Sequence, residues 1–234
     1  MLSPGEEKRI SNMVGKLSPC VESNRKIYNQ YAEGYDAMNV AVGNQLPSFV
    51  AKLCLKHLPA NVKNNMEQCT VLDFPSCTGY TAKSLRDKGF TGIIDGVDGS
   101  VEMIKVAEKK NLYRKITTHL ITPDNPIPFG DNCYDVVING ANHTFTPGNV
   151  EPESVCEFLR VLRPGGIMLL NAAHLAFTDV ESNSKQDLQD VIERLQDEGK
   201  CELIEEVDVD IFQSRSKFNE FQRTTVYCIS KAVK

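Results

Sequence analysis

Several features are missing from this 234-residue sequence, and each absence excludes a class of protein. There is no dense Lys/Arg block and the net charge is −5, which argues against a surface that follows nucleic-acid phosphates. No stretch approaches the length of a membrane-spanning helix. Residues 1–20 are polar and lack an apolar core, so we expect no signal peptide.

Paired cysteines are also missing. None of the eight cysteines stands at CxxC spacing, and no histidine clusters with them. This scatter favours reduced thiols, mostly buried in the core of a cytoplasmic protein, over zinc ligands or disulfides. We therefore expect no metal site and no membrane association.

The apolar residues that are present, 41% of the chain, are enough for one α/β domain with a short extension. Residues 1–24 are predicted to form a flexible arm and residues 25–234 the domain. Tyr28, Tyr31 and Tyr35 have helical spacing, and an amphipathic helix is expected over residues 45–58.

From residue 70 onward, strand patterns alternate with helix patterns. Strands are expected at residues 70–74, 92–97, 116–121, 134–139, 167–171, 201–212 and 224–230. Helices are expected at residues 81–88, 101–110, 152–162 and 185–199, and a turn at residues 163–166. Such alternation predicts a parallel sheet, whereas the last two strands, with no helix between them, can pair antiparallel at one edge.

Two aspartates stand where an α/β sheet binds nucleotide-like ligands. Asp73 ends the first apolar run and is followed by a tight loop and a helix N-terminus. Asp98 ends the second run, where an acid can accept hydrogen bonds from both hydroxyls of a ribose. A helix N-terminal or turn-forming role is the alternative for Asp98.

Several motifs in order give the chain a family resemblance. They are Tyr28-Asn29-Gln30-Tyr31-Ala32-Glu33-Gly34-Tyr35-Asp36, the loop at 71–80, Gly96-Val97-Asp98-Gly99-Ser100 followed by Met103, Leu112-Tyr113, Pro126-Ile127-Pro128 ahead of Tyr134-Asp135, and Leu162-Arg163-Pro164-Gly165-Gly166. The sequence thereby resembles the class I S-adenosylmethionine-dependent methyltransferases, and among them the small methyltransferase-like proteins typified by the one of the Williams–Beuren syndrome region. The resemblance spans roughly residues 25 to 230, and the order and spacing of the motifs carry it.

The resemblance implies a Rossmann-like, seven-stranded, mostly parallel sheet with helices on both faces and an antiparallel last strand. It implies S-adenosyl-L-methionine as the cofactor and residues 25–60 as a helical lid, although ordinary core packing is an equal interpretation of the lid tyrosines. Asp73 matches the acid that contacts the amino-acid end of the cofactor, and Asp98 matches the ribose-binding acid. The predicted cofactor-binding residues are Tyr31, Tyr35, Asp73, Phe74, Pro75, Cys77, Gly79, Asp98, Gly99, Thr122 and Asn139.

The cofactor loop departs from the family pattern, which is close to DxxCGTG. Pro75 and Cys77 stand where glycine or another small residue is usual, and only Gly79 remains. Proline removes an N–H group, and cysteine adds a side chain where the cofactor approaches the backbone. The alternative hypothesis is therefore a catalytically impaired binding module with the same fold and a degenerate loop.

Two loop segments offer further candidates. Asn139 and His143 follow the fourth strand, where the methyl group should emerge, and His143 could serve as a general base. A solvated loop histidine is the alternative, and His174 is treated in the same way. After the third strand, where relatives place an adenine-reading acid, Pro123 occupies that position and Asp124 is more consistent with a surface turn.

The predicted function is methyl transfer to a small molecule or a protein side chain, by direct in-line displacement without a metal. A catalytic base is needed only if the acceptor must first lose a proton. A nicotinamide-dependent dehydrogenase ranks last because GxGxxG is absent after the first strand. The acidic composition argues against a nucleic-acid acceptor, and the sequence specifies neither the acceptor nor the oligomeric state.

Overall fold

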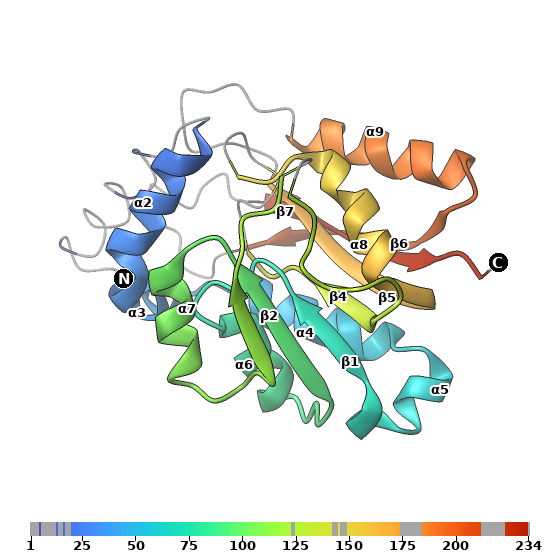
Figure 1. Cartoon of the computed structure of the whole chain (residues 1–234), viewed down its shortest axis with the longest axis horizontal. Helices are drawn as coiled ribbons and strands as arrows, with labels where there is room; N and C mark the ends of the chain where they lie inside the picture. Colours follow the sequence, from blue (N-terminus) through green and yellow to red (C-terminus); the bar gives the residue numbers. More distant parts are fainter. Residues whose placement is uncertain are drawn as a thin grey trace.

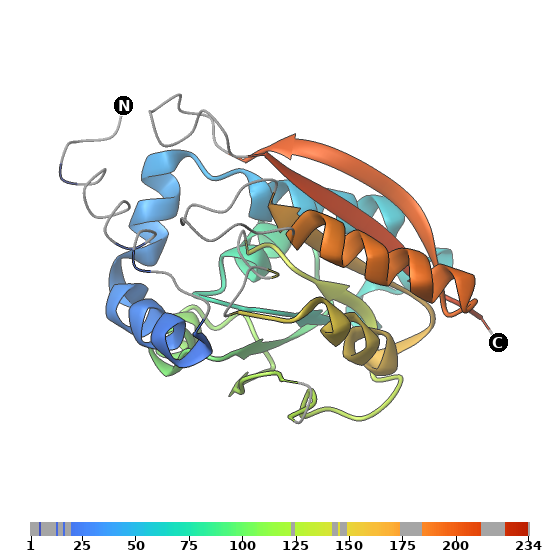
Figure 2. The same cartoon turned by 90° about the horizontal axis from the view of Figure 1, so that it is seen from above.

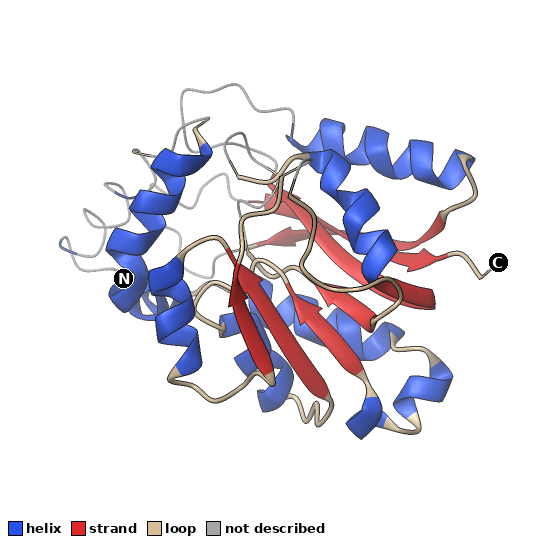
Figure 3. Cartoon of the chain, viewed as in Figure 1, coloured by secondary structure: helices blue, strands red, loops and turns tan. Residues whose placement is uncertain are grey.

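The computed structural model describes residues 5, 13, 16, 20–122, 125–141, 145, 149–173, 184–211 and 223–233. These residues form a central sheet with helices around it (Figure 3). The strands are β1 (Thr70–Asp73), β2 (Ile93–Asp98), β3 (Lys115–Thr118), β4 (Tyr134–Ile138), β5 (Leu162–Ala173), β6 (Cys201–Asp210) and β7 (Arg223–Lys231). The helices are α2 (Val21–Tyr31), η1 (Ala32–Gly34), α3 (Tyr35–Val42), α4 (Leu46–His57), α5 (Ala60–Lys63), η2 (Met66–Gln68), α6 (Tyr80–Asp87), α7 (Val101–Glu108), η3 (Pro152–Ser154), α8 (Val155–Val161) and α9 (Ser184–Asp197).

The seven strands lie in the order β3-β2-β1-β4-β5-β7-β6 (Figure 1). Neighbouring strands from β3 to β5 pair parallel, whereas β7 pairs antiparallel with both β5 and β6. The predicted fold class, with its antiparallel last strand, is therefore confirmed. The chain reverses its direction of winding between β1 and β4, which is where an open α/β sheet forms its ligand crevice.

The side chains of each central strand alternate between two apolar layers. Val71 faces the layer that contains the apolar sides of α4 and α6, whereas Leu72 faces the layer formed with α8 and α9. Val136 and Val137 of β4 divide in the same way. Figure 2 shows α9 on one side of the sheet and α4 on the other. Both faces are therefore covered, which explains the continuous apolar runs of the sequence.

The turn predicted at residues 163–166 is instead part of β5. Tyr134 pairs with Leu162, and Val136 pairs with Ile167. One residue therefore separates the two paired positions on β4, whereas four residues separate them on β5. Gly165 has a left-handed φ of +76°, and a Cβ on Gly166 would lie 2.8 Å from the carbonyl oxygen of Asp135. The glycines therefore allow a bulge inside one continuous strand where the sequence predicted a turn between two elements.

The N-terminal segment forms two helices rather than one. Gly34 ends the short turn η1 between α2 and α3, and Gly43, with φ +65°, ends α3. Both α2 and η1 contact α7 beside the sheet (Figure 1). Within the described residues, no helix has both the length and the apolar character needed to cross a membrane.

Candidate functional site

Asp73 is the last residue of β1, and its carboxylate is completely buried. The Tyr113 hydroxyl donates to Oδ2 of Asp73 at 2.7 Å, whereas Oδ1 has no hydrogen-bond partner among the described residues. Burial raises the pKa of Asp73 to about 8; the Tyr113 hydrogen bond opposes this rise, and the charge of Asp98 adds to it. The site therefore contains a buried acid that accepts a proton near neutral pH.

Asp98 is the last residue of β2 and has the opposite arrangement, with both oxygens bonded. Its Oδ1 accepts from the Ser100 N–H and its Oδ2 from the Cys77 N–H, each at 2.8 Å. Burial raises the pKa of Asp98 to about 6, while these two N–H donors lower it. The Ser100 hydroxyl in turn caps α7, accepts from the Met103 N–H and donates to Oδ1 of Asn29 in α2 at 2.7 Å.

The loop between β1 and α6 joins the two aspartates. Cys77 has a left-handed φ of +46°, which explains why relatives prefer glycine at this position. Burial, together with the Asp98 and Asp73 carboxylates, holds the pKa of the Cys77 thiol well above its ordinary value. The Ser76 N–H donates to the Val97 carbonyl at 2.8 Å, but the buried Ser76 hydroxyl has no partner among the described residues.

Gly79 precedes α6 with φ +85°, and a Cβ there would lie 3.2 Å from the Tyr113 ring. A Cβ on Gly96 of β2 would lie 2.9 Å from the same ring. Tyr113 thus packs against two glycines and reaches Asp73 from beneath the loop. The sequence predicted no role for Tyr113, because only the fold brings its hydroxyl to Asp73, which lies forty residues earlier in the chain.

Tyr28, Tyr31 and Tyr35 all belong to or pack against one small apolar cluster, but they differ in their polar surroundings. Tyr28 and Tyr35 lie near Asp98 and Cys77, and desolvation of their hydroxyls, followed by these negative charges, raises both pKa values. Tyr31 is instead buried in a small cluster with Ile27 and Met13. Of the predicted lid residues, Tyr35 packs against this cluster and also borders the loop, whereas Tyr31 is buried within the cluster.

Phe74 and Thr122 lie apart from this cluster. The Phe74 ring is buried beneath α8, 5.3 Å from the ring of Phe158, so only its backbone faces the loop. Thr122 forms an isolated antiparallel bridge with Asn125, and within the described ranges no hydrogen bond joins it to Asp98. Gly99 follows Asp98, and a Cβ there would approach the Leu120 side chain to 3.0 Å.

Asn139 is buried directly after β4. Its Oδ1 accepts from the Ala141 N–H at 2.9 Å, which organises the turn that follows the strand. A Cβ on Gly140 would lie 2.2 Å from the Thr81 hydroxyl of α6, so the turn packs tightly against the cofactor loop side of the sheet. His143, Pro123, Asp124 and His174 lie outside the described residues, and their roles stay predictions.

A small cavity of about 20 Å³ lies where these elements meet. It has room for about one water molecule. Its walls come from α3, the loop after β1, α6 and the turn after β4. The wall residues are Tyr35, Asn39, Asn44, Pro47, Pro75, Ser76, Cys77, Tyr80, Thr81, Gly140 and Ala141.

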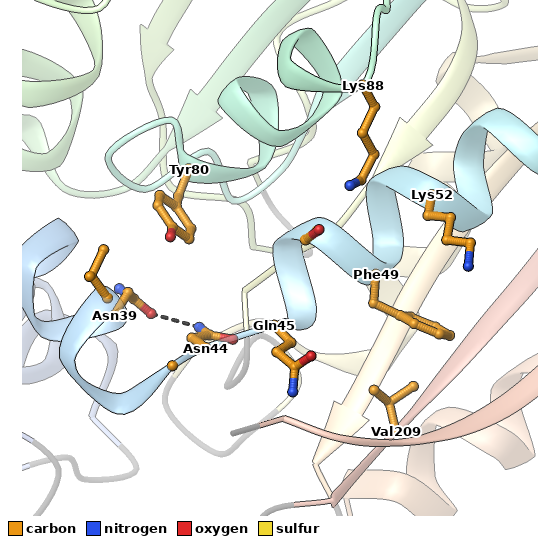
Figure 4. A pocket seen from close by; sticks show the side chains of 11 residues that line it. Asn39, Asn44, Gln45, Phe49, Lys52, Tyr80, Lys88 and Val209 are labelled. Carbon is orange, nitrogen blue, oxygen red and sulfur yellow. Dashed lines mark hydrogen bonds between the residues drawn. The ribbon is translucent and has the colours of Figure 1, made fainter. Parts of the chain in front are cut away.

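A larger pocket of about 470 Å³ adjoins this cavity, since Asn39, Asn44 and Tyr80 line both (Figure 4). It lies between the α3–α4 connection, α6 and the end of β6. Among the described residues, no group of three or more His, Cys, Asp or Glu side chains is placed to hold a metal ion.

Comparisons with known proteins agree with this architecture. The profile of a family described as "Methyltransferase domain" matches residues 72–170, which contain both aspartates. The human methyltransferase-like protein 27 is 26% identical over 181 residues, which cover 75% of this chain and 66% of that protein. A malonyl-[acyl-carrier protein] O-methyltransferase of Coxiella burnetii is 28% identical over 117 residues, 47% of this chain and 38% of that one.

Among solved structures, the [4+2]-cyclase SpnF matches with a TM-score of 0.66 and 15% identity, over 94% of this chain and all (100%) of that one. This likeness concerns the fold alone, and the chain spans only part of the two relatives above. The strand order, the family profile over residues 72–170 and these relatives agree: the chain is similar to methyltransferases in sequence and shares the fold of the structural match.

Proposed function

We propose that the protein binds S-adenosylmethionine between the ends of β1 and β2 and transfers its methyl group to a small-molecule or protein acceptor. The observation that carries this proposal is the pair of buried aspartates, Asp73 and Asp98, which face a common loop with no cation paired to either one in the described part of the chain. Buried carboxylates without a cation are costly, so a cationic ligand would relieve them.

The unpartnered polar atoms of the site match the donors of this cofactor. Oδ1 of Asp73 is buried without a hydrogen-bond donor, and an unmade bond of this kind costs about 1–3 kcal/mol. The methionyl ammonium group would supply the donor. Carboxylate oxygens have further lone pairs, so Asp98 could accept from ribose hydroxyls while it keeps its two backbone donors.

The remaining residues would hold the site closed. Tyr28 and Tyr35 lie against Asp98 and Cys77, where their rings would exclude water from the bound cofactor. The cavity of about 20 Å³ borders the loop of this site at Pro75, Ser76 and Cys77. When bound, S-adenosylmethionine would supply an electrophilic methyl carbon, and the protein would align the acceptor with it.

Isothermal titration calorimetry with S-adenosylmethionine and S-adenosylhomocysteine tests the proposal directly. We expect saturable binding of both, and no binding at millimolar cofactor would reject the enzymatic function. A matched variant, Asp87→Ala, removes an exposed acid at the end of α6 and should leave the affinity unchanged.

A non-catalytic binding module is the second candidate, and the loop itself favours it. Pro75 lacks an N–H group and Cys77 carries a side chain at a left-handed position, where both depart from the family pattern. A solved structure of this fold is named a cyclase, so the fold does not by itself imply methyl transfer. In the Pro75→Gly/Cys77→Gly variant, a large gain in cofactor affinity would support a decayed site, and no gain would favour a native variant loop.

A further inference from the structure

The larger pocket beside the cofactor loop has a composition unlike that of the whole chain. The chain has 31 acidic and 26 basic residues, yet the pocket of about 470 Å³ is lined by two lysines and no acid. Its lining residues are Asn39, Val40, Gly43, Asn44, Gln45, Ser48, Phe49, Lys52, Tyr80, Lys88 and Val209. The volume lies within the range of small-molecule sites.

The two pocket lysines differ from their neighbours on the same helices. Lys56, one turn beyond Lys52 on α4, pairs with Glu205, and Lys83 of α6 pairs with Asp87. Within the part of the chain that the structure describes, no ion pair joins Lys52 or Lys88 to an acid. Figure 4 shows Lys88 extending from the end of α6 toward α4, which carries Lys52. Both lysines line the pocket without an ion pair, although Figure 4 shows the Lys52 ammonium pointing away from Lys88.

The start of α4 adds to this positive potential. Gln45 is the N-cap of this 12-residue helix and lines the pocket together with Ser48. A helix N-terminus attracts anions through its dipole and its free N–H groups. Here the Leu46 N–H already donates to Oδ1 of Asn44 at 3.0 Å and Pro47 has no N–H, so the dipole is the main contribution. Two lysines and a helix N-terminus therefore favour a negatively charged group in the same space.

Three apolar side chains also line the pocket. Val40 is 65% exposed, an unusual position for a large aliphatic side chain, and it lines the pocket with Phe49 and Val209. Phe49 and Val209 lie close to each other at one end of the pocket (Figure 4). An occupant would need an apolar body as well as an anionic head group to match both sets of side chains.

The wall that the two cavities share is fixed by hydrogen bonds. The Asn44 amide donates to Oδ1 of Asn39 at 2.6 Å, and the Asn39 amide donates to the Tyr35 carbonyl at 2.9 Å. On the other side of this wall lie the loop residues Pro75 and Cys77 and the turn after β4. A molecule in the pocket would therefore lie next to the cofactor site.

We propose that this pocket holds the methyl acceptor, and that the acceptor is a small amphipathic anion whose carboxylate or phosphate contacts Lys52 and Lys88 while its apolar body packs on Val40, Phe49 and Val209. The acceptor role rests on the proposed function, whereas the anion site does not depend on it.

The test uses the isotope-labelled full chain and three probes: octanoate, octyl phosphate and octanamide. We expect saturable amide shifts around Phe49 and Tyr80 with octanoate or octyl phosphate, and the tighter of the two identifies the head group. Neutral octanamide should bind about tenfold more weakly or worse, because it makes no charge-assisted contact. No saturable binding of either anion, or equal binding of octanamide, would overturn the proposal.

The matched variants are Lys52→Gln/Lys88→Gln and, as the control, Lys83→Gln of α6, which does not line the pocket. The double variant should lose about tenfold in anion affinity and the control less than about twofold. An unchanged double variant would contradict the assignment. Both variants should keep their affinity for S-adenosylhomocysteine.

Two outcomes separate this inference from the proposed function. Cofactor binding without anion binding would reject the pocket and leave the proposed function intact. Anion binding without cofactor binding would reject the proposed function and with it the acceptor role. In the protein loaded with S-adenosylhomocysteine, NOEs between the probe and the cofactor are expected, and their absence with both molecules bound would also overturn the acceptor role.

Discussion

Acids in two regions of the sheet, buried except for the half-buried Asp135, are satisfied in different ways. Toward the amino ends of the strands, Asp95 pairs with Arg114 and accepts from the Tyr134 hydroxyl, and Asp135 pairs with Arg163 at 2.9 Å. At the carboxyl ends, Asp73 and Asp98 have hydroxyl or amide donors but, among the described residues, no cation.

This difference separates structure from function. An acid that is paired with an arginine, such as Asp95 or Asp135, has its charge balanced within the protein and stabilises the sheet. An acid that is buried without a cation keeps a raised pKa, as Asp73 and Asp98 do. Acids with such raised pKa values are common at functional sites, because a bound ligand can supply the positive charge or hydrogen-bond donor that the protein does not provide. The following variants test that contrast.

The largest expected effect is on cofactor binding by Asp98→Ala. The variant removes the proposed acceptor for the ribose hydroxyls and also frees the N–H groups of Cys77 and Ser100. We expect the affinity for S-adenosylhomocysteine to fall about 100-fold, or about 2.8 kcal/mol. Calorimetry measures this, and an affinity within about threefold of the unmodified protein would contradict the proposed role.

Asp95→Ala should show the opposite pattern, a loss of stability with no loss of binding. It leaves the buried Tyr134 hydroxyl without its acceptor, which costs about 1–3 kcal/mol. The Arg114 side chain is 56% exposed, so water can replace its partner. Urea denaturation measures the free energy of unfolding, and a loss of cofactor affinity in this variant would break the contrast.

Asp73 should make the stability of the cofactor-free protein depend on pH. Its pKa rises from 3.8 to about 8 on folding, so the folded protein holds a proton that the unfolded chain releases. The free energy of unfolding should therefore fall as the pH rises from about 4 to about 8. In Asp73→Asn this slope should be smaller by about 1.4 kcal/mol per pH unit. Denaturation at several pH values in this window measures it, and an unchanged slope would refute the buried, protonated acid.

Tyr113→Phe should have the smallest effect. The variant keeps the ring that packs on Gly79 and Gly96 but removes the donor to Asp73, worth about 1 kcal/mol or about fivefold in cofactor affinity. Since that hydrogen bond lowers the pKa of Asp73, the pH dependence of binding should move to higher pH. Tyr227→Phe, a buried tyrosine of β7, is the control. If the two variants bind the cofactor with the same pH dependence, Tyr113 does not contribute to the cofactor site.

Much of the fold could be predicted because burial on both faces leaves a simple pattern. The run Val136-Val137-Ile138 predicted a central strand, and β4 occupies that position. The bulge in β5 could not be predicted, since Arg163-Pro164-Gly165-Gly166 has the composition of a turn and only its pairing with β4 shows a strand. The helical spacing of Tyr28, Tyr31 and Tyr35 likewise gave no sign that the helix is interrupted at η1, which ends at Gly34.

The candidate site was only partly predictable. A position at the end of a strand identified Asp73 and Asp98, because parallel strands bring their carboxyl ends to one edge. Tyr113 belongs to one of the family motifs, but nothing in the sequence linked its hydroxyl to Asp73. Lys52 and Lys88, which lie far apart in the chain, share a pocket only because α4 packs against α6.

The sequence by itself determined the order of strands and helices, the faces they bury and the two acids at the strand ends, because hydrophobic periodicity and turn residues act locally. The tertiary structure alone decided which acids receive a cation, which tyrosines face the loop and where an anion could bind. Those outcomes depend on contacts between distant segments, and no local pattern encodes them.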